Sequence, residues 1–168
     1  TGLTEANCLA KPDVPQCNSP VYIPATQSKM NSAKNAANSF LDNMGASDQS
    51  GLVSFADNAT LDKALSNDHN ETKSAVNALV PVGSTNIGDA IAFGTVQFDS
   101  NGNGQANKVM ILLTDGKANR PNGPGYGEDP NDVQYALDKA AEAASKNYKI
   151  FTVGLGSDGD INATMLQQ

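Results

Sequence analysis

One unbroken apolar run stands out at residues 109–113, and it ends abruptly in Thr114, Asp115 and Gly116. A short run without polar alternation predicts a strand that is buried on both faces, as in a parallel sheet. Residues 150–155 predict a second buried strand. Because open α/β sheets bind ligands beyond the C-terminal ends of their strands, we expect Asp115 at a ligand-binding edge.

Helix-like and strand-like segments alternate along the rest of the chain. Apolar side chains recur on one helical face between residues 26 and 44, and Gly45 is expected to end that helix. This face comprises Met30, Ala33, Ala37, Phe40, Leu41 and Met44. Residues 51–56 and 60–65 predict an antiparallel strand pair. Further helices are predicted at residues 70–79, at 87–98, from Asp129-Pro130 and from residue 160. This alternation predicts an α/β fold with a mainly parallel sheet.

The length, charge and residue content of the chain exclude several classes of function. The chain has 168 residues, enough for one domain with its own core, and a net charge of -7. No basic patch is visible, which argues against nucleic acid and favours a cation as the small partner. No apolar run approaches the roughly 20 residues of a membrane span. The single histidine, His69, lies in a polar segment where we expect solvent around it. No nucleophile is paired with a base, so we do not expect an enzyme.

The first 25 residues are rich in proline and have no helical or strand period, which predicts a loop insertion. Cys8 and Cys17 lie in this segment. A disulfide that closes the small loop between them is the favoured interpretation, and it implies an oxidising compartment outside the cytosol. Two free thiols in a cytosolic loop are the alternative.

Oxygen ligands for a cation come from two separate segments. The loop at residues 83–86 offers Ser84, Thr85 and Asn86, and the strand end at residues 109–116 offers Asp115. Hard divalent cations such as Mg²⁺ prefer oxygen ligands in octahedral geometry. One hydroxyl and one carboxylate make half of such a site. Thr85 has a second interpretation, as the cap of the helix that begins near Asn86.

Two other motifs suggest different chemistry. Residues 154–159 spell G-x-G-x-x-G after a strand, but Asp158 and Asp160 would repel a pyrophosphate, so a tight turn is favoured. Residues 99–104 match the first half of an EF-hand loop. The twelfth position is Met110 instead of the required glutamate, so we expect a polar loop there.

The order of the segments carries a family resemblance. An amphipathic helix is followed by G-L-V-S-F-A-D-N-A-T-L, G-S-T-N-I-G-D-A-I, V-M-I-L-L-T-D-G and I-F-T-V-G-L-G. This order resembles the von Willebrand factor type A domain over about residues 26–168, and it is similar to such domains in bacterial and archaeal surface or pilus proteins. The resemblance implies a doubly wound, mainly parallel sheet with an antiparallel edge hairpin.

The resemblance also implies a metal-ion-dependent adhesion site at the C-terminal edge of the sheet. Such a site holds Mg²⁺ or Mn²⁺, with Ca²⁺ as a further option, and an acidic group of the partner completes the ligand shell. Thr85 corresponds to the threonine of the second metal-binding loop, and Asp115 to the aspartate of the third. Ser84, Asn86 and Gly116 lie next to these positions.

The first metal-binding loop departs from the family pattern D-x-S-x-S. Thr1 stands where the first serine would be, and Leu3, which cannot ligate a metal, stands in place of the second. The central first strand and its aspartate are absent from the chain, and the last helix is cut short. We therefore expect a fragment whose missing strand comes from upstream in the same polypeptide or from another chain.

The function implied by the resemblance is that of an extracellular, cell-surface adhesion module. It would engage a protein or glycan that offers an acidic group. The alternative is a structural or assembly domain of a surface or pilus protein with a degenerate metal site. Reduced cysteines would favour a third hypothesis, an intracellular domain of a metal-chelatase or motor-associated complex.

Overall fold

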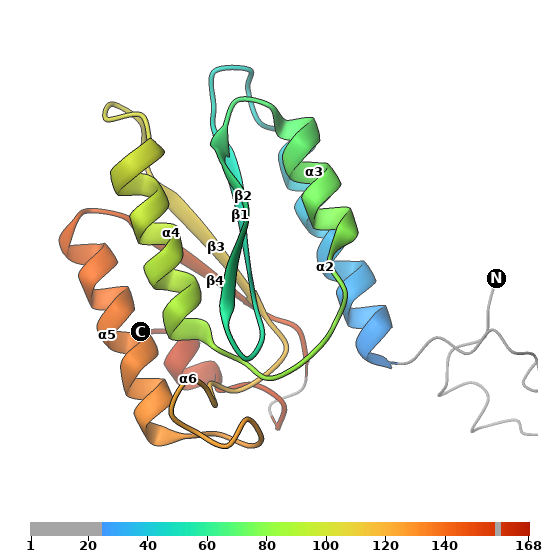
Figure 1. Ribbon diagram of the computed structural model, residues 1–168, viewed down its shortest axis with the longest axis vertical. Helices are drawn as coiled ribbons and strands as arrows, with labels where there is room; N and C mark the ends of the chain where they lie inside the picture. Colours follow the sequence, from blue (N-terminus) through green and yellow to red (C-terminus); the bar gives the residue numbers. More distant parts are fainter. Residues whose placement is uncertain (1–24, 157–158) are drawn as a thin grey trace, which may run out of the picture.

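The fold is an α/β arrangement in which helices flank two pairs of strands (Figure 1). The computed structural model describes residues 25–156 and 159–168. In chain order the elements are α2 (Ala25–Asp42), β1 (Ser50–Phe55), β2 (Ala59–Ser66), α3 (His69–Ala78), α4 (Ile87–Asn101), β3 (Val109–Thr114), α5 (Pro130–Ser145), β4 (Lys149–Gly154) and α6 (Ala163–Leu166). None of these described helices is long and apolar enough to cross a membrane.

The described strands form two separate pairs. β1 and β2 are antiparallel, with Phe55 opposite Ala59 beside the turn. β3 and β4 are parallel and in register from Val109 and Lys149 onward. The predicted α/β class and its antiparallel hairpin are therefore confirmed. In the described part of the chain β1 and β3 do not pair with each other, and the central strand expected between them stays a prediction.

One face of β3 carries most of the buried core. Leu112 packs in a cluster with side chains of α4, α5 and α6. The cluster comprises Ile87, Ile91, Leu112, Ala118, Ala136, Ala143 and Met165. Figure 1 shows α4 and α5 side by side, and these two helices pack closely on each other. Full burial of an aliphatic side chain such as Ile87 contributes about 1.5–3 kcal/mol, so this cluster is the main apolar anchor of the fold.

The prediction that the β3 strand is buried on both faces is wrong. Val109 and Ile111 are each 39% exposed, whereas Leu112 is 8% exposed. Phe151, the neighbour of Ile111 on β4, is 57% exposed. Successive strand residues point to opposite faces, and α4 and α5 pack on the Leu112 face. The sheet therefore has one covered face and one apolar face that reaches solvent.

The helix α2 packs on α3, and its apolar face is narrower than predicted. Leu41 is buried, but Phe40 is half exposed. Lys34 and Asn38 both hydrogen-bond to Asn77 of α3, which places polar groups in this interface. The helix ends at Asp42, so the expectation that Gly45 ends it is also wrong.

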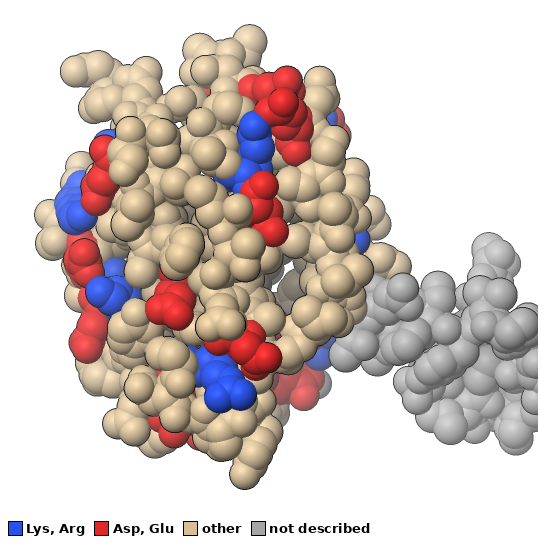
Figure 2. Space-filling model, viewed as in Figure 1, with Lys and Arg blue, Asp and Glu red and all other residues tan. Residues whose placement is uncertain are grey.

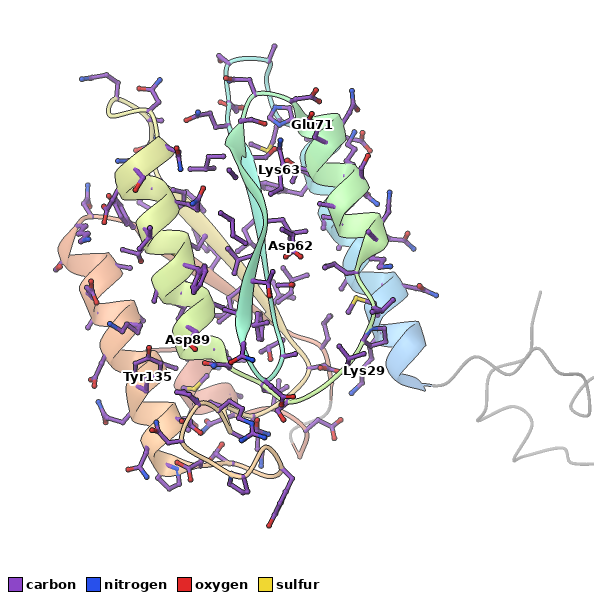
Figure 3. All side chains as sticks on the ribbon, viewed as in Figure 1. Lys29, Asp62, Lys63, Glu71, Asp89 and Tyr135 are labelled. Atoms are coloured by element: carbon purple, nitrogen blue, oxygen red, sulfur yellow. The ribbon has the colours of Figure 1, made fainter. Side chains whose placement is uncertain are left out.

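The contact between α4 and α5 depends on a glycine and a tyrosine. A Cβ at Gly88 would lie 2.2 Å from Tyr135 Cδ1, so only glycine lets the ring approach α4 this closely. The Tyr135 hydroxyl donates to Asp89 Oδ1 over 2.8 Å, and Figure 3 shows the two side chains pointing toward each other. The Asp89 hydrogen bond, together with partial burial, raises the pKa of Tyr135 to about 12.

Substituting Gly88→Ala is expected to destabilise the protein. Alanine is favoured over glycine in a helix by about 1 kcal/mol, but overpacking costs about 1–3 kcal/mol, and the hydroxyl bond prevents the ring from moving aside. The net loss is expected to be about 1 kcal/mol in the free energy of urea unfolding. Gly94→Ala on the same helix is the control, because its Cβ meets the flexible Met110 side chain. Equal stability of both variants would contradict the proposed close contact.

The stability of the protein is expected to fall as pH rises from 10 to 12. The ordinary pKa of tyrosine is 10, and the folded state holds Tyr135 protonated to about 12. Between these pH values the unfolded state releases the proton more readily than the folded state. The contribution of the protonated Tyr135 to the free energy of unfolding is therefore lost as pH rises. Because Tyr135 is partly exposed, the loss is expected to stay below about 1 kcal/mol. Urea unfolding of the natural protein and of Tyr135→Phe over this pH range tests it, and parallel curves would exclude the effect.

Candidate functional site

The loop before α4 meets the start of the loop after β3. A Cβ added at Gly116 would lie 2.6 Å from Thr85 Oγ1, so the Gly116 backbone lies directly against the Thr85 hydroxyl. Asp115 is the residue before Gly116, at the C-terminal end of β3. The structure therefore brings the Thr85 hydroxyl close to the chain segment that carries the Asp115 carboxylate. Any side chain at position 116 would displace that hydroxyl.

A positive charge lies beside the Asp115 carboxylate. Lys29 Nζ of α2 is 3.9 Å from Asp115 Oδ2 and 3.6 Å from Asp160 Oδ2. The Lys29 side chain is 32% exposed, and both carboxylates are 49% exposed. Three distant parts of the chain meet here: α2, the end of β3 and the loop before α6. Sequence analysis missed Lys29 and considered Asp160 only as a group that repels pyrophosphate.

The residues present fit a divalent cation in part. Their donors are oxygens, and the Lys29 ammonium already lies between two carboxylates as a cation would. In the described ranges no three His, Cys, Asp or Glu side chains come together as a metal cluster. The fit therefore depends on the Thr85 hydroxyl and on further ligands from water, a partner or the chain outside those ranges.

A groove of about 300 Å³ runs beside the Thr85 hydroxyl. Its lining includes Gly116 and Asn119, two acidic side chains, Glu128 and Asp160, and one basic side chain, Lys117. A larger hollow of about 620 Å³ lies between the end of α2 and the start of α3. None of the predicted site residues that the structure describes lines this larger hollow, so the smaller groove is the one that belongs to the candidate site.

Asn86, predicted to lie near the cation site, is a capping residue in the structure. It is fully buried, and its Oδ1 accepts the Asp89 N–H at 3.2 Å. Its Nδ2 donates to Asp89 Oδ2 at 2.7 Å and to Asp57 O at 3.2 Å. Asn86 is thus the N-cap of α4, and the alternative interpretation of Thr85 as the cap is wrong.

Ser84 faces the hairpin turn and the long loop after β3. Its hydroxyl donates to Gly125 O over 3.1 Å. Its hydroxyl and backbone N–H also lie beside the Asp57 carboxylate and, with the Arg120 guanidinium, hold the pKa of Asp57 below its ordinary value. Ser84 therefore connects the loop before α4 to Gly125 and Asp57, and its predicted place near a cation site stays a prediction.

The loop after β3 is held by buried polar contacts. Asp132 of α5 is fully buried and accepts hydrogen bonds from the backbone N–H groups of Asn122 and Gly123, both at 2.8 Å. Arg120 donates to Gly123 O over 3.0 Å and to Asp57 over 3.4 Å. On the face shown in Figure 2, basic side chains lie next to acidic ones, in keeping with such ion pairs. These contacts hold the loop after β3 against α5 and the hairpin turn.

Several predictions made from sequence need correction or lie outside the described residues. His69 is not surrounded by solvent, because its Nδ1 lies 2.8 Å from Ser50 Oγ and its Nε2 lies 3.1 Å from Gly45 O. Asp99 lies in helix α4 and not in a loop, and it contacts the Lys146 ammonium and the Tyr148 hydroxyl. The residues that lie outside the described ranges are Thr1, Leu3, Cys8, Cys17 and Asp158, so their predicted roles stay predictions.

The family model of the von Willebrand factor type A domain matches residues 23–168. The chain therefore belongs to this family, as the segment order predicted. No curated protein matches the chain by sequence.

Solved structures with the same fold include proteins from distant organisms. A von Willebrand factor type A protein from Catenulispora acidiphila has 24% identity and a TM-score of 0.65, covering 86% of this chain and 32% of that chain. Proximal thread matrix protein 1 from the mussel byssus, with a zinc-occupied MIDAS motif, has 21% identity and a TM-score of 0.60, covering 84% and 33%. Manganese-loaded TRAP protein of Plasmodium vivax has 18% identity and a TM-score of 0.60, covering 80% and 52%. At these identities the likeness shows the fold.

Replacing Lys29 with methionine is expected to strengthen the binding of Mn²⁺. The ammonium would compete with a cation for Asp115, and an exposed ion pair of this kind is worth up to about 1 kcal/mol, which corresponds to about a fivefold gain in affinity. Isothermal titration measures the change. Lys34→Met is the control, because Lys34 lies on the same helix but bonds to Asn77 of α3. Unchanged or weaker binding by the Lys29 variant would argue against the competition.

Proposed function

We propose that this chain is an extracellular adhesion module that binds an acidic group of its partner through a divalent cation. The close contact between the Thr85 hydroxyl and Gly116, the residue that follows Asp115 at the end of β3, carries the proposal. A hydroxyl oxygen and the chain segment that carries a carboxylate therefore come together at this edge of the fold.

Asp115 and Thr85 would hold the cation by different chemistry. The Asp115 carboxylate neutralises part of the charge, either directly or through a water molecule, and the Thr85 hydroxyl adds a neutral oxygen. Thr1 is the further ligand that the family resemblance suggests. Mg²⁺ and Mn²⁺ take six ligands, so coordination positions remain for water and for a carboxylate of the partner. When bound, the cation supplies a residual positive charge that attracts an acidic group.

The metals of related structures support a divalent cation. The mussel thread protein has zinc in its MIDAS motif, and the Plasmodium TRAP protein is manganese-loaded. We propose Mg²⁺ or Mn²⁺ for this chain because its donors are a hydroxyl and a carboxylate, which suit hard cations. The partner would be a protein or glycan with an exposed acid, at the cell surface, with no chemical conversion of the partner.

A second candidate function is that of an assembly or scaffold domain of a surface or pilus protein. The Lys29 ammonium favours it, because it pairs with Asp115 without any metal. Leu3 favours it as well, because its side chain carries no ligand atom where the family pattern has a serine. In this case the loops would keep their geometry for packing against other subunits.

Titration of the complete protein with Mn²⁺ and Mg²⁺ separates the two functions. Binding by the natural protein is expected, with a loss of at least a hundredfold in Asp115→Ala, because the carboxylate is the only charged ligand in the proposed set. Thr85→Val is expected to bind about tenfold more weakly and Thr85→Ser nearly normally, because serine keeps the hydroxyl. Asp138→Ala on the exposed surface of α5 is the control. Absence of binding by the natural protein would leave the scaffold function.

A further inference from the structure

Asn119 holds both backbone polar groups of Thr85. Its Oδ1 accepts the Thr85 N–H at 2.8 Å, and its own N–H donates to Thr85 O over 3.2 Å. Asn119 is only 7% exposed, so these bonds are shielded from water. It lies in the loop after β3, four positions beyond Asp115. The two proposed ligand loops are therefore joined by one residue.

The same side chain also holds the returning part of the loop. Asn119 Nδ2 donates to Gly127 O over 3.2 Å, and the neighbouring Ala118 O accepts the Asp129 N–H at 3.0 Å. A side-chain amide combines the acceptor that Thr85 needs with the donor that Gly127 needs. A carboxylate of the same size keeps only the acceptor, and an aliphatic side chain has neither.

The neighbours of Thr85 leave its backbone little freedom. Asn86 is fully buried as the cap of α4, and the Ser84 hydroxyl is bonded to Gly125 O. Asn119 fixes the residue between them, while Gly116 of the same loop lies against its hydroxyl oxygen. The bonds to Asn119 thus hold the Thr85 backbone, which fixes the point from which its hydroxyl extends toward Gly116.

We propose that Asn119 is a positioning residue that aims the Thr85 hydroxyl at the cation, an inference that rests on the proposed function. Mg²⁺ requires near-ideal octahedral geometry with ligands at about 2.0–2.1 Å, so a small shift of the hydroxyl weakens binding. Loss of a residue that orients a metal ligand typically costs about 10–100-fold in metal affinity. Asn119 contacts the ligand residue and acts on the cation through it.

A double-mutant cycle in the complete protein tests this role. Mn²⁺ affinity is measured for the natural protein, Asn119→Ala, Thr85→Val and the double variant. We expect Asn119→Ala to bind about 10–100-fold more weakly when Thr85 is present, and to change affinity less than twofold in the Thr85→Val background. Asn122→Ala is the matched control, because its side chain bonds to Asp132 in the same loop without touching Thr85. It is expected to bind normally.

The outcomes distinguish this proposal from the proposed function. If the natural protein binds Mn²⁺ and Asn119→Ala binds within twofold of it, the positioning role is overturned and the cation site stands. An equal loss in the Thr85→Val background, or in Asn122→Ala, indicates a general loop effect and also overturns the role. If the natural protein does not bind Mn²⁺, the proposed function itself has failed.

Asn119→Asp provides a second variant if the alanine variant does not fold. It keeps the acceptor for the Thr85 N–H and loses the donor to Gly127 O. We expect it to retain at least a third of the natural affinity for Mn²⁺. A loss of more than tenfold would show that the bond to Thr85 is not the one that matters.

Discussion

The buried Asn86 amide is the constraint on which the arrangement of this domain depends. A buried amide without partners costs about 1–3 kcal/mol, and Asn86 meets this demand by bonding to the hairpin turn at Asp57 and to Asp89 of α4. These bonds tie the β1–β2 hairpin to the start of α4, although the two strand pairs do not share a ladder among the described residues. The position of α4 then determines where Ile87 enters the core and where Thr85 meets the loop after β3.

The candidate site combines hydrogen-bonded loops with a partly exposed ion pair. The buried, hydrogen-bonded side chains are Asn86, Asn119 and Asp132. They restrict the backbone conformations that the loops around Thr85 can adopt. Lys29 and Asp115, in contrast, are partly exposed and lie at ion-pair distances that contribute little stability. Displacing the ammonium from Asp115 would therefore cost little in the proposed site.

Membership of the von Willebrand factor type A family establishes the fold, and the chemistry of this chain has to be argued from its own residues. Thr85 lies against Gly116, which follows Asp115 at the end of β3, and this contact is the basis of the proposed site. Lys29 and Asp160 add charges that the family pattern did not predict, and they shape how a cation or an acidic partner would approach. An adhesion module and a scaffold domain would differ mainly in whether a metal replaces Lys29.

Local sequence patterns determined the order of helices and strands, the Asp129-Pro130 start of α5 and the place of Asp115 at a strand end. These features depend on side-chain periodicity and on backbone preferences within a few residues. Tertiary structure alone decided that Val109 reaches solvent, that Asn86 caps α4 in place of Thr85, and that Lys29 approaches Asp115. The physical reason is that burial, helix capping and ion pairing depend on which distant segments of the chain come into contact. The local spacing of apolar and polar side chains does not contain that information.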